Sequence, residues 1–141
     1  MAHFDFVVVG YGGETKMIKP FRKNTTVSNS KRQSFHSTRI GNPFTVKEIH
    51  FSFALNTQRL LQNSVWVCGS AETPDDQRPA GFNLLAGLGG EDYMVGDGQE
   101  GLIKIPINEK FNGGYYLVVE SYNADPINSH TVDVTVLYEE S

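Results

Sequence analysis

The sequence predicts an all-β protein: an antiparallel β-sandwich or jelly roll of seven to eight short strands, with long loops and an extended basic N-terminal segment. Apolar and polar residues alternate strictly over 131–139, where Val132, Val134 and Val136 share one face of a strand. No segment repeats apolar residues at helical spacing, and turns rich in Gly, Asn and Pro separate the β-type segments. The 141 residues match one domain, 1–141, which can bury a core without disulfide or metal staples.

In the N-terminal half, residues 4–9 form an apolar strand that the glycine-rich turn at 10–13 ends. Residues 46–55 predict a strong strand with alternating apolar positions, and 64–68 a short one. Residues 69–100 are rich in Gly, Asp and Pro. They predict long loops with two brief strands.

In the C-terminal half, Ile103, Ile105 and Ile107 share a face, and Pro106 among them indicates an edge position or a strand end. Two further strands follow at 115–122 and 131–139. Because the linker between them is rich in turn residues, we expect these two strands to pair as a long antiparallel hairpin.

Residues 16–45 are polar, basic and nearly free of acidic residues. Residues 1–47 contain eight Lys/Arg and two acidic residues, a charge of +6. Residues 48–141 contain four Lys/Arg and fourteen acidic residues, a charge of −10. Few side chains in 16–45 are suited to a core, so the segment predicts either an extended loop across the domain or an arm that becomes ordered on a partner.

Such an arm is suited to docking on an acidic protein surface, although a solvated loop explains the same composition. Its cationic and aromatic residues are the predicted partner-binding residues: Lys16, Lys19, Phe21, Arg22, Lys23, Lys31, Arg32, Phe35 and Arg39.

No catalytic constellation is visible, so the sequence predicts a non-enzymatic protein without a cofactor. Cys68 follows an apolar strand and is expected to be a buried hydrophobe. The four histidines are not spaced as a metal pair, and no metal site is predicted. The acidic loop from Glu91 to Glu100 leaves calcium binding open, although a solvated turn is the favoured interpretation.

The N-terminus lacks the basic and apolar regions of a signal peptide, and no stretch is long and apolar enough for a membrane helix. These features predict synthesis in a cytoplasm and no membrane partner.

Three segments together resemble the small jelly-roll proteins of tailed-bacteriophage virions, especially capsid decoration (cement) proteins: residues 45–55, 101–120 and 129–139. The resemblance covers about half of the chain. It implies location in the virion, a homo-oligomer with a trimer favoured, and the major capsid protein or another virion protein as partner. The basic segment would hold the protein to an acidic shell or to a neighbouring copy.

Two other functions fit the same residues. A receptor- or glycan-binding jelly roll of a phage tail or fibre would use exposed Tyr and Asn or Asp side chains. A capsid subunit could instead contact nucleic acid through the basic segment. An overall pI of about 5.5 disfavours nucleic acid as a partner.

Overall fold

The computed structural model describes residues 7–11, 14–53, 61–71, 79–86, 93–95 and 102–141. These residues form ten β-strands and no α-helix, which confirms the predicted all-β class. No helix in the described ranges is long and apolar enough to cross a membrane. The strands are β1 (Val7–Tyr11), β2 (Glu14–Val27), β3 (Arg32–His36), β4 (Phe44–Phe53), β5 (Leu61–Cys68), β6 (Phe82–Asn83), β7 (Tyr93–Val95), β8 (Leu102–Phe111), β9 (Tyr116–Asn123) and β10 (His130–Glu140).

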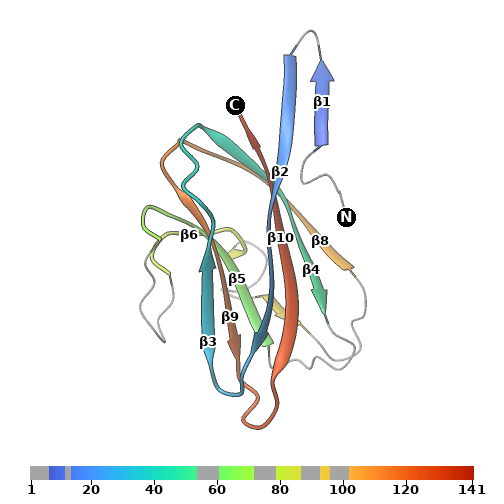
Figure 1. The fold of residues 1–141 in the computed structure, drawn as a ribbon, viewed down its shortest axis with the longest axis vertical. Coiled ribbons are helices and arrows are strands. Elements are labelled where there is room, and N and C mark those ends of the chain that lie inside the picture. Colours follow the sequence, from blue (N-terminus) through green and yellow to red (C-terminus); the bar gives the residue numbers. More distant parts are fainter. Residues whose placement is uncertain (1–6, 12–13, 54–60, 72–78, 87–92, 96–101) are drawn as a thin grey trace.

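The strands form two antiparallel sheets that lie face to face (Figure 1). Sheet A has the order β1-β2-β10-β4-β8, and sheet B has the order β3-β9-β5-β6, with β7 also paired to β5. This arrangement is the predicted β-sandwich.

The pairing pattern is that of a jelly roll. Strands pair from the outside of the chain inwards: β2 with β10, β3 with β9, β4 with β8 and β5 with β6. Two further pairings, of β10 with β4 and of β9 with β5, wrap this long hairpin into two sheets. The result is the doubled Greek key of a jelly roll, with β1 and β7 as additions.

The core lies between the sheets and follows the period of two along each strand. Val132, Val134 and Val136 of β10 are fully buried, as are Phe44 and Phe51 of β4. Burying side chains of this size contributes about 1.5–3 kcal/mol each. The apolar residues of the two central strands therefore hold sheet A to sheet B.

The turn from β9 to β10 is fixed by polar side chains. The carboxylate of Asp125 accepts hydrogen bonds from the backbone N–H groups of Ile127 (2.8 Å) and Asn128 (3.1 Å), and it lies 2.8 Å from Nε2 of His130. These contacts lower the pKa of the buried Asp125 carboxyl to about 2, with the Ile127 N–H as the largest cause.

Several predictions about strand positions are confirmed. Strand β8, which contains Pro106, is an edge strand of sheet A. Residues 69–100 contain the two brief strands β6 and β7. The predicted strand at 4–9 is observed from Val7 and continues through Gly10 to Tyr11; residues 4–6 lie outside the described ranges.

The predicted hairpin of 115–122 with 131–139 is wrong. Strand β9 pairs with β3 and β5 in sheet B, whereas β10 pairs with β2 and β4 in sheet A. The turn between them therefore crosses from one sheet to the other. Both strands bury an alternating apolar face against the same core. Two strands in opposite sheets meet this requirement as well as two strands that pair in one sheet.

The prediction of an arm or loop at 16–45 is also wrong. Strand β2 pairs with β10 from Ile18 to Val27, and β3 pairs with β9. Val27, Ile40 and Phe44 from this segment are buried in the core. A segment with few apolar residues can form a sheet strand here because its neighbour β10 supplies the valine face.

Candidate protein-interaction site

The predicted partner-binding residues do not gather on one surface. In β2, Phe21 and Lys23 pair with the buried Val136 and Val134 and so share the inward side, whereas Arg22 lies on the outward side. In β3, Arg32 and Phe35 lie on opposite sides. Lys31 and Arg39 are exposed, one before and one after β3. The side chain of Lys16 lies outside the described part of the structure.

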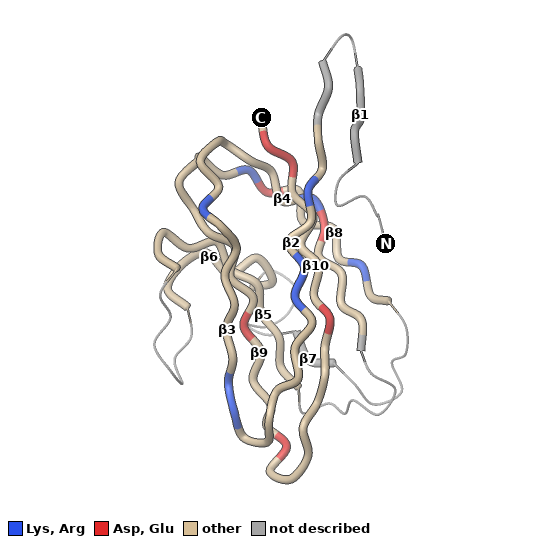
Figure 2. Tube along the Cα trace, in the orientation of Figure 1, with Lys and Arg blue, Asp and Glu red and all other residues tan. Residues whose placement is uncertain are grey.

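On sheet A, the basic residues of β2 are paired with acidic residues of β10. Nε and Nη2 of Arg22 donate to the carboxylate of Asp133 at 3.0 and 2.6 Å. This hydrogen bond lowers the pKa of the Asp133 carboxyl. Lys19 forms an ion pair with Glu140, which raises the pKa of the Lys19 ammonium group through a side-chain hydrogen bond. Figure 2 shows the blue positions of β2 next to the red positions of β10.

On sheet B, Arg32 is paired with a carboxylate that is nearly inaccessible to solvent. Nη1 of Arg32 donates to Oε1 of Glu120 at 2.6 Å, and the guanidinium group lies over the ring of Tyr122. The hydroxyl of Ser64 donates to Oε2 of Glu120 at 3.1 Å, and Nε1 of Trp66 donates to that hydroxyl at 2.7 Å. The chain thus neutralises three of its predicted partner-binding cations internally.

The other described cations among the predicted partner-binding residues are separated from one another. Lys23 lies 4.6 Å above the ring centroid of Phe35. Lys31 and Arg39 form no ion pair with a described residue, but they lie at opposite ends of β3. The basic segment is therefore not a continuous cationic surface.

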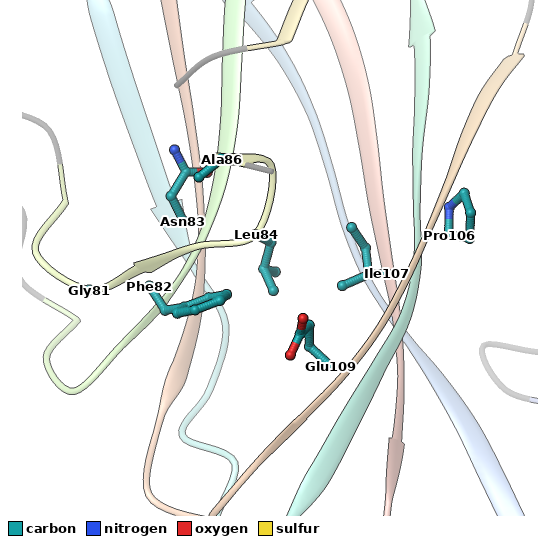
Figure 3. A pocket seen from close by; sticks show the side chains of 8 residues that line it. All are labelled: Gly81, Phe82, Asn83, Leu84, Ala86, Pro106, Ile107 and Glu109. Atoms are coloured by element: carbon teal, nitrogen blue, oxygen red, sulfur yellow. The ribbon is translucent and has the colours of Figure 1, made fainter. Parts of the chain in front are cut away.

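A groove opens between the edge strands β6 and β8, where the two sheets separate (Figure 3). Its volume is about 440 Å³. Phe82 and Leu84 from one side and Ile107 and Glu109 from the other point toward one another across it. Half of the Phe82 surface is exposed, and its ring meets that of Phe111 edge to face. The described residues that line the groove are mainly apolar, and one of them, Glu109, carries a carboxylate.

Sequence reasoning missed this groove because it predicted long loops with two brief strands over 69–100 and assigned neither strand a partner. Its signal was the apolar run at 82–85 beside Gly81. A Cβ atom at Gly81 would lie 2.4 Å from the backbone oxygen of Val67, so glycine lets this loop lie directly against β5.

A second surface feature is the ribbon of β1 with the first part of β2. Strand β10 pairs with β2 only from Ile18 onward, so residues 14–17 pair with β1 alone. In Figure 1 this two-stranded ribbon extends beyond the body of the sandwich. Met17 within it is 37% exposed.

The described residues contain no group of three or more His, Cys, Asp or Glu side chains that could hold a metal ion. The acidic side chains of the loop from Glu91 to Glu100, for which calcium binding was left open, lie outside the described ranges. Cys68 is buried, and burial raises the pKa of its thiol to about 11, as expected for a packing residue.

Neither a protein family nor a curated protein matches this sequence. Among solved structures, the chain is similar to the core of Drosophila NLP, reported with insight into pentamer formation and histone binding, at 14% identity and a TM-score of 0.35, over 83% of this chain and 96% of that one. It is also similar to a chain of infectious bursal disease virus, Gx strain, at 11% identity and a TM-score of 0.38. That match covers 95% of this chain but spans only 36% of the viral chain. Likenesses this distant carry no argument about function.

Proposed function

We propose that this chain is a non-enzymatic structural protein of a virus particle, which decorates and stabilises a tailed-phage capsid by binding other protein surfaces. The observation that carries the proposal is a complete jelly-roll pairing with a two-stranded ribbon that extends beyond it. The resemblance of three segments to phage decoration proteins supports the same role. The partner is the major capsid protein or another virion protein.

The function requires only differential binding. A protein that binds the assembled shell and not its free subunits stabilises the shell by mass action, in proportion to the logarithm of its concentration over its dissociation constant. Jelly-roll strands provide rigid surfaces for this purpose, and no reacting group is needed.

The pairing of Arg22, Lys19 and Arg32 with carboxylates weakens the nucleic-acid alternative. Phosphate binding depends on cations that can release counterions, and a cation already held by a carboxylate releases fewer. We therefore favour protein surfaces as partners over nucleic acid.

The test is the composition and heat stability of particles of the virus whose genome encodes this chain. We expect the chain in purified intact particles in a fixed ratio to the major capsid protein, and a lower disruption temperature for particles from a deletion strain. Purified added protein should restore that temperature. Particles that lack the chain, or that are equally stable without it, would contradict the proposal.

A further inference from the structure

The turn between β9 and β10 carries the most exposed large apolar side chain of the described chain, Ile127, which is 79% exposed. Pro126, next to it, is also exposed. The isoleucine side chain takes no part in forming the turn, because Asp125 accepts a hydrogen bond from its backbone N–H. A polar residue at this position would form the same turn, so turn formation does not explain the isoleucine.

The frame of this turn is held by side-chain hydrogen bonds. The buried Asn123 donates to the backbone oxygen of Val27 at 3.0 Å, which ties the turn to the end of β2. From the β2–β3 turn, Nδ2 of Asn29 donates to the backbone oxygen of Pro126 at 3.1 Å. In Figure 1 these two turns lie side by side at the end of the sandwich opposite the C-terminus. An apolar side chain on a frame fixed in this way loses little further backbone freedom when it binds a partner.

The same end of the molecule has one accessible cation. Lys31 is exposed at the end of the β2–β3 turn and forms no ion pair with a described residue. The other described charged groups here are Asp125 and His130, which are buried against each other, and Arg32, which a carboxylate already holds. We call Lys31, Pro126 and Ile127 the turn tip: an apolar surface with a free positive charge.

The groove between β6 and β8 has the complementary properties. Its described lining is mainly apolar, and Phe82 is half exposed at its rim. Glu109 is its one described charged residue, is exposed, and forms no ion pair with a described residue. The adjacent Lys110 pairs with Thr45 and lies on the opposite side of β8. The groove therefore matches the turn tip in polarity and in charge.

The outer edge of β8 favours side chains over an added strand as the occupant of this groove. Pro106 lacks a backbone donor, and Asn108 adopts a positive φ of 56° where the register of β8 shifts. These two residues interrupt the edge that an added strand would need.

The turn tip does not reach the groove of its own subunit. Asn123, at the start of the turn, pairs with Leu61, whereas Phe82 pairs with Val67. Leu61 and Val67 are separated along β5 by about 20 Å at the usual rise of a strand. Ile127 lies beyond Asn123, so only the groove of another molecule is within its reach.

We propose that the turn tip of one copy docks in the β6–β8 groove of a second copy, with Ile127 against Phe82 and Lys31 close to Glu109. Because tip and groove are different surfaces, the contact is head-to-tail and repeats as a ring or an open chain. The contact goes beyond the proposed function, since it concerns the purified chain alone and needs no particle.

The first test is the mass of the full chain by light scattering after gel filtration, up to the highest soluble concentration. A single turn in a groove makes a small interface, so we expect weak association of the wild type. In Ile127→Ser the apparent dissociation constant should rise at least about tenfold, because the contact loses its apolar anchor. The melting temperature should stay unchanged, because the side chain is exposed in the free chain.

Charge exchange tests the orientation of the same contact. Lys31→Glu and Glu109→Lys should each weaken association, because like charges then meet, and the double exchange should restore it. Lys104→Glu is the matched control for the lysine reversal, since Lys104 is exposed but pairs with His50 on the outer face of sheet A. Circular dichroism verifies that each variant is folded.

The second test is cross-linking between copies. Ile127→Cys protein and size-tagged Phe82→Cys protein are mixed and oxidised with diamide, and a mixed disulfide-linked dimer is expected. Leu102→Cys replaces Phe82→Cys in the control mixture, which should give far less product. Leu102 is exposed to a similar degree as Phe82 but lies on the outer face of sheet A. The native thiol does not interfere, because Cys68 is buried.

A wild-type chain that stays monomeric at every concentration would overturn the proposed contact. So would an oligomer that Ile127→Ser and both charge reversals leave unchanged, or a cross-link that forms equally with the Leu102 control. The particle role is decided separately, by whether purified particles contain the chain and lose heat stability without it.

Discussion

Two arginines from the same basic segment form carboxylate pairs on the outer faces of the two sheets, in opposite environments. The Arg22 side chain is 66% exposed and its partner Asp133 is 14% exposed. The corresponding values for Arg32 and Glu120 are 19% and 2%. Both pairs have an N–O distance of 2.6 Å, so they differ in burial and not in the length of the contact.

This difference in burial indicates which charged residues can be substituted with little loss of stability. An exposed pair gains little because water solvates both ions when they separate. A buried pair has already lost that solvation, and removal of one ion leaves the other in a medium that penalises charge. We therefore expect the outer face of sheet A to tolerate charge substitutions. The outer face of sheet B behaves as a second interior layer that includes Val118 and Cys68.

The largest effect is expected for Arg32→Ala. It removes the positive charge that compensates the buried Glu120 carboxylate, and the free energy of unfolding should fall by about 3–5 kcal/mol. Urea denaturation at pH 7 measures this change. Arg32→Met combined with Glu120→Leu is the control, because it removes both charges and should recover most of the loss. A loss of unfolding free energy smaller than that expected when an exposed ion pair is removed would show that solvent reaches Glu120.

A smaller loss is expected for Ser64→Ala, which removes the hydroxyl that links Trp66 to Glu120. The loss of a buried hydrogen-bonding group costs about 1–3 kcal/mol. The same denaturation measurement applies. Combined with Arg32→Ala, the effect should be non-additive, because both changes act on one carboxylate. Simple additivity would indicate that the two contacts are independent.

Asp125 extends the comparison to a buried carboxylate that turn N–H groups satisfy without an arginine. Its pKa of about 2 in the folded protein lies below an ordinary value of about 4. Its contribution to stability is therefore present above pH 4 and is lost as the pH falls from about 4 to 2. Urea midpoints measured across this range should fall less steeply for Asp125→Asn than for the wild type. Parallel curves would contradict this assignment.

The smallest effect is expected for Arg22→Ala. Because its guanidinium group is mostly in water, the melting temperature should change by at most about 2 °C. The residual difference should shrink further in 1 M salt, where exposed charges are screened. Calorimetry at two salt concentrations checks both statements. A change as large as that of Arg32→Ala would remove the distinction between the two faces.

Local pattern predicted the strands of this protein better than their partners. Alternation in 131–139 located β10, and Pro106 correctly indicated an edge strand. Pairing failed because turn residues at 123–129 fit a hairpin and a crossover between sheets equally well. The strand β2 was missed because its own residues are polar, and the apolar face that holds it belongs to β10, over a hundred positions away.

The charge asymmetry of the sequence was real, but its interpretation changed. A basic N-terminal part and an acidic remainder predicted docking on an acidic partner. Much of that partner is the chain itself, since Asp133, Glu140 and Glu120 all come from the acidic part. Composition gives the sum of charges in a segment, whereas only strand register shows which charges meet. The β6–β8 groove was missed for a similar reason, since its two walls come from different sheets.

The central position of β10 has a consequence for how the protein is made. This strand lies between β2 and β4, so the middle of sheet A cannot form until residues 130–140 have emerged from the ribosome. Arg22 and Asp133, for example, are 111 positions apart. Contacts of such long range form slowly, and until then the edges of β2 and β4 are open to wrong partners. The middle of sheet A therefore forms only once residues 130–140 have been made, and a chaperone that shields β2 and β4 until then would raise the yield of folded protein.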